Sequence, residues 1–365
     1  MYIYEHSEWP IFIWSDKLII NQLAQVKYLQ GRLLGRMESF GFNLQEQANH
    51  EILTQDVLKT SEIEGEVLND WQVRSSIARK LGLDISGMVT SDRHVDGVVE
   101  MMLDATGNYN EALTKEILFD WHSALFPTGR SGIRKIIAGG WRKDTKGPMQ
   151  VVSGTPGKEN IHFEAPPAAV LEKQMAEFLC WFNQKSKVDL VLKAAIAHLW
   201  FITLHPFEDG NGRIARAIAD KILAQSDAQN KRFYSMSSQI RKERNDYYAI
   251  LEKTQKGSLD ITEWMVWFLS CLKSSIESSD LILEQVLKKH NFWMKNNSKV
   301  SNDRQRKMLN RLLEGFEGKL TSSKWAKMNK CSQDTALRDI NELIKKDVLM
   351  KMPAGGRSSA YALKD

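Results

Sequence analysis

The twelve residues 205–216, HPFEDGNGRIAR, constrain the fold of this chain more than any other part of its sequence. They follow residues 190–204, which are almost entirely apolar and therefore typical of a helix buried on every side. A further helical stretch begins near Gly212 and continues to Ala224. The sequence thus predicts two helices joined by a short glycine-containing loop, with the polar residues of the run gathered at that loop.

The loop and the start of the second helix carry residues that suit the binding of phosphate groups. Gly210 and Gly212 let backbone amides point inward, and the following helix adds its N-terminal amides and its dipole. The side chain of Asn211 can hydrogen-bond a phosphate oxygen. Arg213 and Arg216 lie three residues apart, so both can face one end of the helix and clamp a polyphosphate. These residues predict a nucleotide-phosphate site.

Two more residues of the run supply groups for chemistry on a phosphate. Asp209 can hold Mg²⁺, which phosphoryl chemistry usually requires. His205 has an ordinary pKa of about 6.5, which suits a base that removes a hydroxyl proton at neutral pH. Taken singly, a histidine before a proline and a Gly-x-Gly are more often structural, and we interpret Phe207 as a core anchor. Their combination within one short run is far more specific than any of its parts.

The run resembles the Fic signature HxFx(D/E)GNGRxxR, with a match at every specified position. The resemblance covers roughly residues 100–275. Residues 141–163 are rich in glycine and proline, contain two β-like pieces, and resemble the β-hairpin known as the Fic flap. Residues 240–251, with Arg244 and a pair of tyrosines, resemble the next Fic helix.

The resemblance implies a protein adenylyltransferase, which transfers AMP from ATP to a Ser, Thr or Tyr hydroxyl of a target protein or of itself. It makes His205 the general base and Asp209 the residue that holds Mg²⁺. The implied phosphate contacts come from the amides of Gly210 and Gly212, the amide side chain of Asn211, Arg213, and Arg216, which would orient the γ-phosphate.

The flap and the family's variants refine this expectation. The flap near Val151 and Val152 would hold the target segment by backbone pairing, a form of strand addition. The toxin kinases of the family have a lysine in place of the first motif arginine and lack the GNG loop. This chain keeps both features, which favours AMP transfer over phosphorylation. The motif alone leaves phosphocholine transfer open.

An inhibitory element is expected upstream of the core. Thr60, Glu64 and Gly65 match the pattern (S/T)xxxE(G/N) of the inhibitory helix found in Fic proteins. A glutamate beside a glycine that ends a helix is usually a surface residue, so the pattern gains its meaning from the Fic signature elsewhere. A carboxylate can pair with a guanidinium, and a Glu64–Arg216 pair would prevent Arg216 from holding the γ-phosphate. By resemblance to bifunctional members, Glu64 could instead position a water that removes AMP.

The C-terminal part is predicted to be a winged helix-turn-helix. Residues 322–330 and 333–346 read as two helices separated by a short turn, and a glycine turn with β-like flanks follows. Residues 301–365 hold 14 Lys and Arg against 8 Asp and Glu, a net charge of +6, whereas the whole chain has +5. Thr335, Arg338 and Arg357 are therefore candidate DNA contacts, and a protein-docking or dimerising module without a DNA role is the alternative.

Composition indicates a soluble, intracellular enzyme. No apolar run approaches the roughly 18 residues that a membrane span needs, and the first residues lack the features of a signal peptide. The three cysteines, Cys180, Cys271 and Cys331, lie far apart, which is typical of free thiols in a reducing compartment. We therefore expect a cytoplasmic protein that does not bind membranes and that could form a homodimer.

Together these features predict a mainly α-helical chain of three parts. Residues 1–95 form an N-terminal segment with the inhibitory helix at about 45–65, residues 96–285 the Fic core, residues 286–302 a linker and residues 303–365 the winged helix. Two other functions remain open: a DNA-binding regulator whose Fic core only senses nucleotide, and an enzyme that removes AMP. A pure sensor would not need His205.

Overall fold

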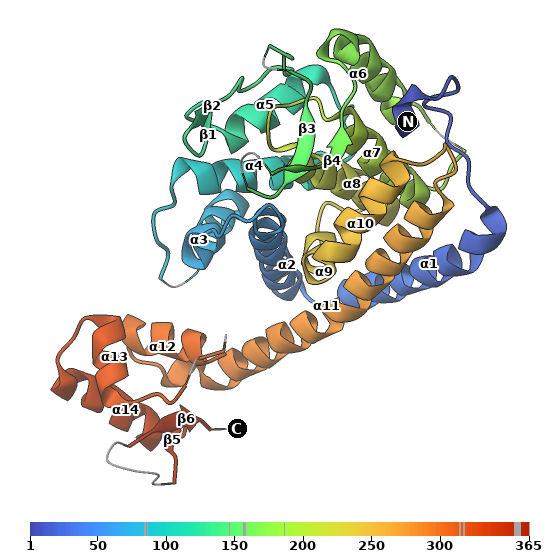
Figure 1. Ribbon diagram of the computed structural model, residues 1–365. Helices are drawn as coiled ribbons and strands as arrows, with labels where there is room; N and C mark the ends of the chain where they lie inside the picture. Colours follow the sequence, from blue (N-terminus) through green and yellow to red (C-terminus); the bar gives the residue numbers. More distant parts are fainter. Residues whose placement is uncertain are drawn as a thin grey trace. The chain divides into compact units, whose positions relative to one another are not determined.

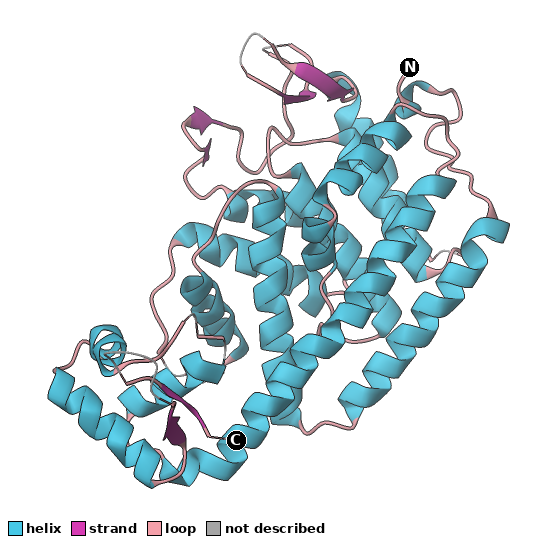
Figure 2. Ribbon diagram, turned by 60° about the horizontal axis from the view of Figure 1, so that its bottom comes forward, coloured by secondary structure: helices cyan, strands magenta, loops and turns pink. Residues whose placement is uncertain are grey.

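The computed structural model of the protein is mainly helical and contains short two-stranded antiparallel sheets (Figures 1 and 2). It describes residues 1–83, 85, 87–145, 147–155, 158–185, 187–313, 315–316, 318–353 and 359–364. The chain divides into two compact units, the first formed by Met1–Gly82 and Val89–Ser279, the second by Leu83–Met88 and Asp280–Asp365. Within the part of the chain that is described, no helix is both long and apolar enough to cross a membrane.

The first unit is an assembly of helices, one of which, at residues 190–204, has the bounds predicted from its apolar sequence. They are α1 (Asp16–Glu38), α2 (Phe42–Ile63), α3 (Asp70–Leu81), α4 (Arg93–Gly107), α5 (Lys115–Leu125), α6 (Ala168–Asn183), α7 (Leu190–Leu204), α8 (Asn211–Asp227), α9 (Met236–Lys242), α10 (Arg244–Gln255) and the first part of α11 (Thr262–Asn296).

Helices α7 and α8 form the centre of this unit and pack closely on each other. Every residue of α7 from Val191 to Leu204 is buried, as its all-round apolar sequence predicts. The side chain of Asp189 caps its N-terminus by accepting a hydrogen bond from the backbone N–H of Val191. The loop between the two helices is short, so its polar residues lie at the edge of the most deeply buried part of the unit.

Helix α2 packs against α3, α9 and the central α8. Its last residue is Ile63, and Gly65 follows in the left-handed region at φ 86°, which ends the helix as a glycine commonly does. The end of α2 is therefore fixed next to α8, and Glu64 lies at this junction.

The predicted flap hairpin is present. Strands β3 (Gln150–Ser153) and β4 (Asn160–Glu164) pair antiparallel, with an irregularity between Val151 and Val152. A second, very short hairpin, formed by β1 (Arg130–Ser131) and β2 (Arg134–Lys135), precedes it and was not predicted. Two-residue strands of arginine, serine and lysine carry no hydrophobic alternation, so the sequence gives no sign of them.

Two helical regions differ from the sequence expectation. Helix α4 was not predicted, although the Asp92 side chain caps it and its apolar residues recur at helical spacing. The helix expected over residues 240–251 is two helices, α9 and α10, which meet at Glu243. Neither glycine nor proline marks this break, so composition alone could not reveal it.

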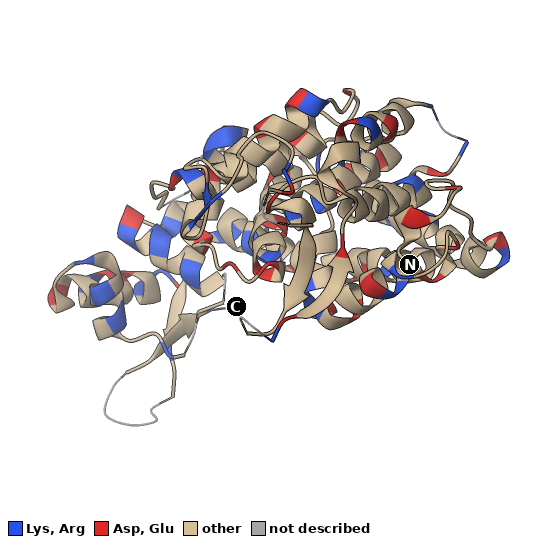
Figure 3. Cartoon of the chain, turned by 45° about the horizontal axis from the view of Figure 1, so that its top comes forward, with Lys and Arg blue, Asp and Glu red and all other residues tan. Residues whose placement is uncertain are grey.

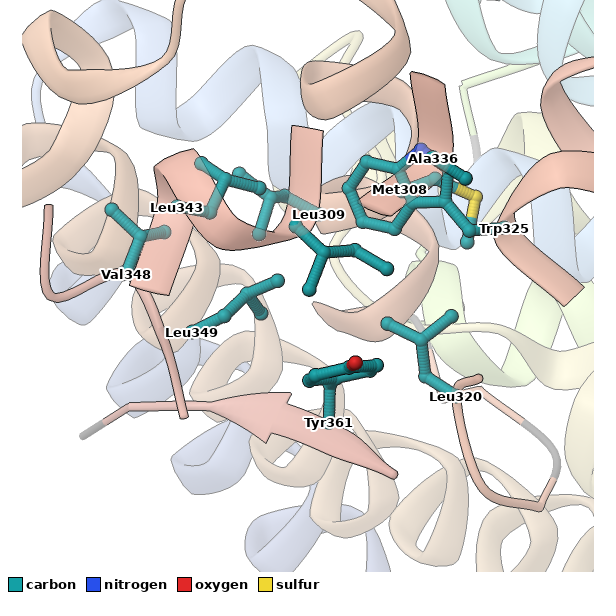
Figure 4. Close-up of a cluster of buried hydrophobic side chains, with 10 residues drawn as sticks. Met308, Leu309, Leu320, Trp325, Ala336, Leu343, Val348, Leu349 and Tyr361 are labelled. Atoms are coloured by element: carbon teal, nitrogen blue, oxygen red, sulfur yellow. The ribbon is translucent and has the colours of Figure 1, made fainter. Parts of the chain in front are cut away.

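The second unit contains α12 (Asp303–Leu313), α13 (Ser322–Asn329), α14 (Gln333–Lys345) and a hairpin of β5 (Leu349–Lys351) with β6 (Tyr361–Leu363). Figure 4 shows its core, in which buried side chains of all these elements converge. The cluster comprises Met308, Leu309, Leu320, Trp325, Ala336, Ile340, Leu343, Val348, Leu349 and Tyr361. Three helices followed by a hairpin is the element order of the predicted winged helix, an assignment that stays a prediction.

The predicted linker requires a correction. Residues 286–296 are helical, because α11 continues to Asn296, and the compact units divide between Ser279 and Asp280. Phe292 and Trp293 pack against the core of the second unit, so this Lys-rich passage has an apolar face. Met1–Gly82 and Val89–Ser279 belong to one compact unit, so the N-terminal segment packs together with the predicted core.

The contact between α4 and α5 predicts a large effect of one methyl group. A Cβ added at Gly97 would lie 1.8 Å from the carbonyl oxygen of Ala124, so Gly97→Ala must force the two helices apart. We expect it to lower the free energy of unfolding by at least about 2 kcal/mol. Gly107→Ala, at the exposed end of the same helix, has no atom within 4 Å and should change it by less than about 1 kcal/mol. Urea unfolding measures both, and equal effects would contradict the packing.

Candidate active site

His205 ends helix α7 in the left-handed conformation, with φ 48° and ψ 55°. A non-glycine residue pays about 1–2 kcal/mol for this geometry, so its neighbours must hold it there. The Nδ1 atom of its ring lies 3.3 Å from the carbonyl oxygen of Ile202. Because a carbonyl only accepts, Nδ1 carries the proton and Nε2 keeps a free lone pair. Burial lowers the pKa of His205 to about 4, so the ring is neutral at pH 7.

Arg142, which sequence analysis did not single out, holds the turn at His205. Its Nε donates to the carbonyl oxygen of His205 at 2.8 Å, and its backbone N–H donates to that of Pro206 at 2.9 Å. The rest of its buried guanidinium binds Asp144 and the carbonyl oxygen of Pro166. The base of the flap and the predicted general base are therefore connected through one side chain.

The loop after His205 is held from within by Asn211. The side-chain oxygen of Asn211 accepts from the backbone N–H of Phe207 at 2.9 Å, and its amino group donates to the carbonyl oxygen of Phe207 at 2.8 Å. Gly210 has φ 79°, and a Cβ there would lie 2.9 Å from the ring of Phe126. The observed contribution of Asn211 is therefore to loop shape, and its contact with a phosphate stays a prediction.

His122 on α5, another residue missed from the sequence, supports the same loop. Its Nδ1 accepts from the backbone N–H of Gly139 at 3.0 Å, so Nε2 carries the proton and donates to the carbonyl oxygen of Asp209 at 3.2 Å. The ring also stacks on Phe207, with centroids 4.1 Å apart. Burial lowers the pKa of His122 to about 4, which keeps both contacts intact at neutral pH.

Asp209 lies on the accessible side of the loop. Its Oδ1 accepts from the backbone N–H of Gly210 at 2.5 Å, and its Oδ2 accepts from the hydroxyl of Ser131. Each oxygen keeps further accepting capacity, and the residue is half-buried. Among the described residues no three His, Cys, Asp or Glu side chains gather to hold a metal ion. A single carboxylate is nevertheless enough for Mg²⁺, which binds few protein ligands besides phosphates.

Arg216 contacts the predicted inhibitory residues Thr60 and Glu64. Its Nη2 lies 2.7 Å from Oε1 of Glu64, and its Nε donates to the hydroxyl of Thr60 at 2.8 Å. Nη2 also donates to the carbonyl oxygen of Thr60 at 2.9 Å. The arginine side chain is 1% exposed. The predicted contact between Glu64 and Arg216 is thus present, through one oxygen of the carboxylate.

The carboxylate of Glu64 also lies directly against the start of α8. A Cβ built on Gly212 would come within 2.2 Å of Oε1 of Glu64. The first amides of a helix have no partner within the helix and carry its positive dipole end. Glu64 therefore occupies the position at this helix end where an anion is most favoured.

The turn that carries Glu64 is fixed by α10. Nε of Arg244 donates to the carbonyl oxygen of Ile63 at 2.6 Å, and the hydroxyl of Tyr248 donates to the same oxygen at 3.3 Å. Arg244 also lies 5.1 Å from the ring centroid of Tyr248. Both residues fall in the segment that resembles a Fic helix, but nothing in the sequence indicates that they hold the end of α2.

The two motif arginines have different carboxylate partners, and their joint contact with a polyphosphate stays a prediction. Arg213 pairs with Glu66, its Nη1 lying 3.0 Å from Oε2, whereas Arg216 pairs with Glu64. The guanidinium of Arg213 also lies 5.1 Å from the ring centroid of Phe126. Glu66 was not predicted as a site residue, and its only sequence sign is its place two residues after Glu64.

The flap residues Val151 and Val152 lie on β3, which pairs with β4 alone among the described strands. Val152 is 48% exposed. The ring of His162 on β4 connects the flap to α10, with Nδ1 2.7 Å from a carboxylate oxygen of Glu252. One edge of β3 is therefore open for backbone pairing, as the strand-addition prediction requires.

Comparison with known proteins identifies the region that contains these residues. Residues 112–223 match the Fic/DOC family. The chain contains a Fic/DOC domain. Residues 2–83, which include Glu64 and Glu66, match another family, described only as a domain of unknown function, DUF4172.

Several relatives of the Fic/DOC domain are protein adenylyltransferases. A probable protein adenylyltransferase of Aquifex aeolicus is 29% identical over 101 residues, which make up 28% of this chain and 29% of that protein. Another, of Caenorhabditis briggsae, is 37% identical over 95 residues, 26% of this chain and 17% of that protein. A third, of Culex quinquefasciatus, is 24% identical over 63% of this chain and 42% of that protein. The chain thus spans less than half the length of these relatives.

Solved structures of Fic proteins share the fold. A Fic family protein of Desulfovibrio desulfuricans matches with a TM-score of 0.53 at 19% identity, covering 95% of this chain and 96% of that one. Fic-1 of Caenorhabditis elegans matches with a TM-score of 0.51 at 20% identity, covering 73% and 74%. The mainly helical fold class predicted from the sequence is confirmed.

The residues predicted to contact DNA lie in the second unit. The hydroxyl of Thr335 contacts that of Ser332 at the N-terminus of α14, at 2.9 Å. Arg338 is exposed on the same helix, on the side opposite its buried residues. Arg357 lies outside the residues that the structure describes.

The buried ring of His198, which binds the hydroxyl of Tyr247 beside Arg216, predicts a measurable response to acid. Burial lowers its pKa to about 3, whereas the unfolded chain takes up the proton near pH 6.5. The unfolded state therefore binds more protons below pH 6.5, and the stability contributed by His198 is lost as the pH falls, at up to about 1.4 kcal/mol per pH unit.

The contribution of His198 must be separated from that of buried Asp220, whose raised pKa makes its own contribution to stability fall as the pH rises. A variant that lacks His198 allows this comparison. We expect His198→Gln to reduce the loss of unfolding free energy between pH 7 and pH 5. Urea unfolding at several pH values gives the slope, which does not depend on the absolute stability of the variant. Equal slopes for both proteins would show that His198 is not held neutral.

Proposed function

We propose that this chain is an autoinhibited protein adenylyltransferase, which transfers AMP from ATP to a Ser, Thr or Tyr hydroxyl of a target protein or of itself. The observation that carries the proposal is the Glu64 carboxylate at the start of α8, paired with Arg216, beside a neutral His205. The names of the related adenylyltransferases support the same reaction. We expect the protein to work in the cytoplasm.

The proposed reaction uses the first turn of α8 to hold the phosphates of ATP. The backbone N–H groups of Asn211, Gly212 and Arg213 have no acceptor within the helix and can donate to phosphate oxygens. Nε2 of His205 accepts the proton of the target hydroxyl while that oxygen bonds to the α-phosphorus. The bond from the α-phosphorus to the bridging oxygen breaks, and pyrophosphate leaves with its electron pair. Catalysis comes mainly from positioning and from charge at the phosphates.

Asp209 is the proposed holder of Mg²⁺. Its half-buried carboxylate lies in the loop that would face the phosphates, and hydrogen bonds from Ser131 and Gly210 fix its orientation. Magnesium supplies neutralisation of phosphate charge when bound. The protein holds the carboxylate in place, and His122 helps by donating a hydrogen bond to the carbonyl oxygen of Asp209.

Inhibition follows from competition between two anions for one place. The carboxylate of Glu64 already accepts from Arg216 and lies against Gly212, where a phosphate would otherwise bind. ATP could not use Arg216 and this helix end without displacing Glu64. The buried Thr60 contacts hold the arginine in the inhibited arrangement.

The target would bind along the flap. The open edge of β3 offers backbone groups near Val151 and Val152 for pairing with an extended segment, and Arg142 connects the flap base to His205. Because such pairing contacts the backbone of the target and not its side chains, it places few requirements on the sequence of the target segment.

Removing the inhibitory carboxylate is the direct test of this function. Glu64→Gly should raise incorporation of AMP from labelled ATP by about tenfold or more. The substitution removes the hydrogen bond between Glu64 and Arg216, and a hydrogen bond to a charged group contributes roughly 1.5–3 kcal/mol. His205→Ala in the same background should lower the rate by about 10²–10⁴-fold.

A matched control separates inhibition from loss of helix stability. Glu62 lies two residues earlier on the same helix and pairs with Lys59 instead of a motif arginine. Glu62→Gly should leave the transfer rate low. Equal activation by both variants would point to a damaged helix, and activity in the Glu64→Gly, His205→Ala protein would exclude His205 as the base.

A second function, DNA binding by the second unit, is favoured by the exposed face of α14. Arg338, Asn341 and Lys345 are exposed at helical spacing on this face, while Ala336, Ile340 and Leu343 are buried. Figure 3 shows basic residues (blue) interspersed with acidic ones (red) along the helices of the protein. A winged helix would place such a face in the major groove.

Duplex binding by the intact chain tests this second function. We expect affinity that falls steeply with salt, and Arg338→Ala should weaken binding about fivefold or more, as for the loss of one phosphate or base contact. The exposed Lys173 of α6, in the first unit, provides a control, since Lys173→Ala should have no effect. Fluorescence anisotropy with a labelled duplex measures both, and equal affinities would exclude α14 as the contact.

A further inference from the structure

A chain of three charged side chains ends on the first motif arginine. Glu66 lies in the connection between α2 and α3 and accepts from Nη1 of Arg213 at 3.0 Å through Oε2. Its other oxygen, Oε1, lies 2.6 Å from Nε2 of His94, near the start of α4. Glu66 therefore bridges an arginine of α8 and a histidine of α4.

Both nitrogens of the His94 ring face acceptors. Nδ1 lies 3.0 Å from the carbonyl oxygen of Leu125, while Nε2 faces the carboxylate of Glu66. A neutral ring has one proton and would turn a lone pair toward one of these oxygens. The two contacts are jointly favourable only when the ring carries both protons. In agreement, the adjacent carboxylate of Glu66 raises the pKa of His94 above its ordinary value.

The guanidinium of Arg213 is fixed by its neighbours, but one of its nitrogen donors lacks an acceptor. Its side chain is 5% exposed and lies over Phe126. Its buried Nε has no hydrogen-bond partner among the described residues. An unpaired charged donor is costly in such surroundings, which points to a ligand that would accept from it.

The charge of this group depends on His94. With a protonated ring, Glu66 is balanced by His94 and Arg213 keeps a net charge of +1 for a ligand. With a neutral ring, Glu66 and Arg213 cancel each other. A phosphate at the start of α8 therefore meets one more positive charge in the first case than in the second.

We propose that Glu66 and His94 are positioning residues for Arg213, and that the protonated His94 leaves the charge of Arg213 available to the phosphates of ATP. This inference rests on the proposed function only in taking a nucleotide triphosphate as the ligand. It concerns Arg213 and is separate from the Glu64–Arg216 contact.

Groups on several elements influence the protonation of His94 and Glu66. Arg213 on α8 opposes protonation of His94, while Glu66 from the α2–α3 connection favours it. Asp209, in the loop before α8, acts on Glu66 in the direction opposite to His94 and Arg213. The carbonyl oxygen of Leu125 on α5 also favours the protonated ring. Glu66 remains the strongest influence, since it contacts the ring directly.

The test measures binding without turnover. We would titrate α,β-methylene-ATP, whose bridge cannot be cleaved by AMP transfer, with Mg²⁺ into the Glu64→Gly protein by calorimetry from pH 6 to pH 9. Affinity should fall about three- to tenfold as the pH rises through the pKa of His94, as for the loss of one half-buried charge. The nucleotide's own titration is common to all variants and is removed by comparing them at equal pH.

Two further variants locate the effect. In the Glu64→Gly background, His94→Gln should bind more weakly than its parent at pH 6 and as well as its parent at pH 9, so the difference between the two proteins disappears as the pH rises. Glu66→Gln should keep tight binding between pH 7.5 and pH 9, because no carboxylate then cancels Arg213. Glu62→Gln, the matched control, should keep the transition of its parent.

The outcomes separate this inference from the proposed function. A transition that persists in His94→Gln, or weak binding by Glu66→Gln at every pH, would overturn the positioning role. An NMR titration of His94 gives an independent readout, since Glu66→Gln should lower its pKa. If the Glu64→Gly protein binds the analogue with the expected pH dependence but transfers no AMP, the proposed function fails and the inference stands. Absence of binding at every pH would overturn both.

Discussion

The N-terminal end of α8 concentrates positive charge in a buried place, and the rest of the site is arranged around it. The helix dipole, Arg213 and Arg216 all contribute, and both arginine side chains are at most 5% exposed. Buried charges of one sign are costly unless they are paired. In this structure the connection after α2 supplies the partners, with Glu64 on one arginine and Glu66 on the other. Under the proposed function, binding of a nucleotide would be an exchange of anions, in which phosphates replace at least one carboxylate.

This exchange explains why α2 is held so firmly. Thr60 accepts twice from Arg216, while Arg244 and Tyr248 hold the carbonyl oxygen of Ile63. These contacts keep the carboxylate of Glu64 at the helix end without help from a ligand. Under the proposed function, the affinity for a nucleotide is the difference between its own contacts and those it displaces, so the contacts that hold Glu64 would also keep the basal rate low.

The sequence predicted the parts whose pattern is local. The apolar run of α7, the glycine loop, the flap strands and the contact between Glu64 and Arg216 all follow from spacing or from resemblance to Fic proteins. The supporting residues were missed, because Arg142, His122 and His94 act through partners far away in the chain. Each of them binds a backbone carbonyl oxygen. Such contacts leave no signature in the sequence, since any backbone carbonyl oxygen can accept and only the fold determines which one is near.

The spacing of the two motif arginines does not predict which protein side chains they contact. Three residues apart on one helix, they are predicted to clamp a single polyphosphate, and in the structure each pairs with its own carboxylate. Arg216 contacts Thr60, which does not titrate, in addition to Glu64. Arg213 contacts Glu66, and Glu66 in turn contacts the ring of His94, which can gain or lose a proton. A proton can therefore change the charge around Arg213 without touching the Glu64–Arg216 contact. If both proposals hold, inhibition and phosphate attraction are governed by different residues of one short connection, and a change in pH acts only on the attraction of phosphate.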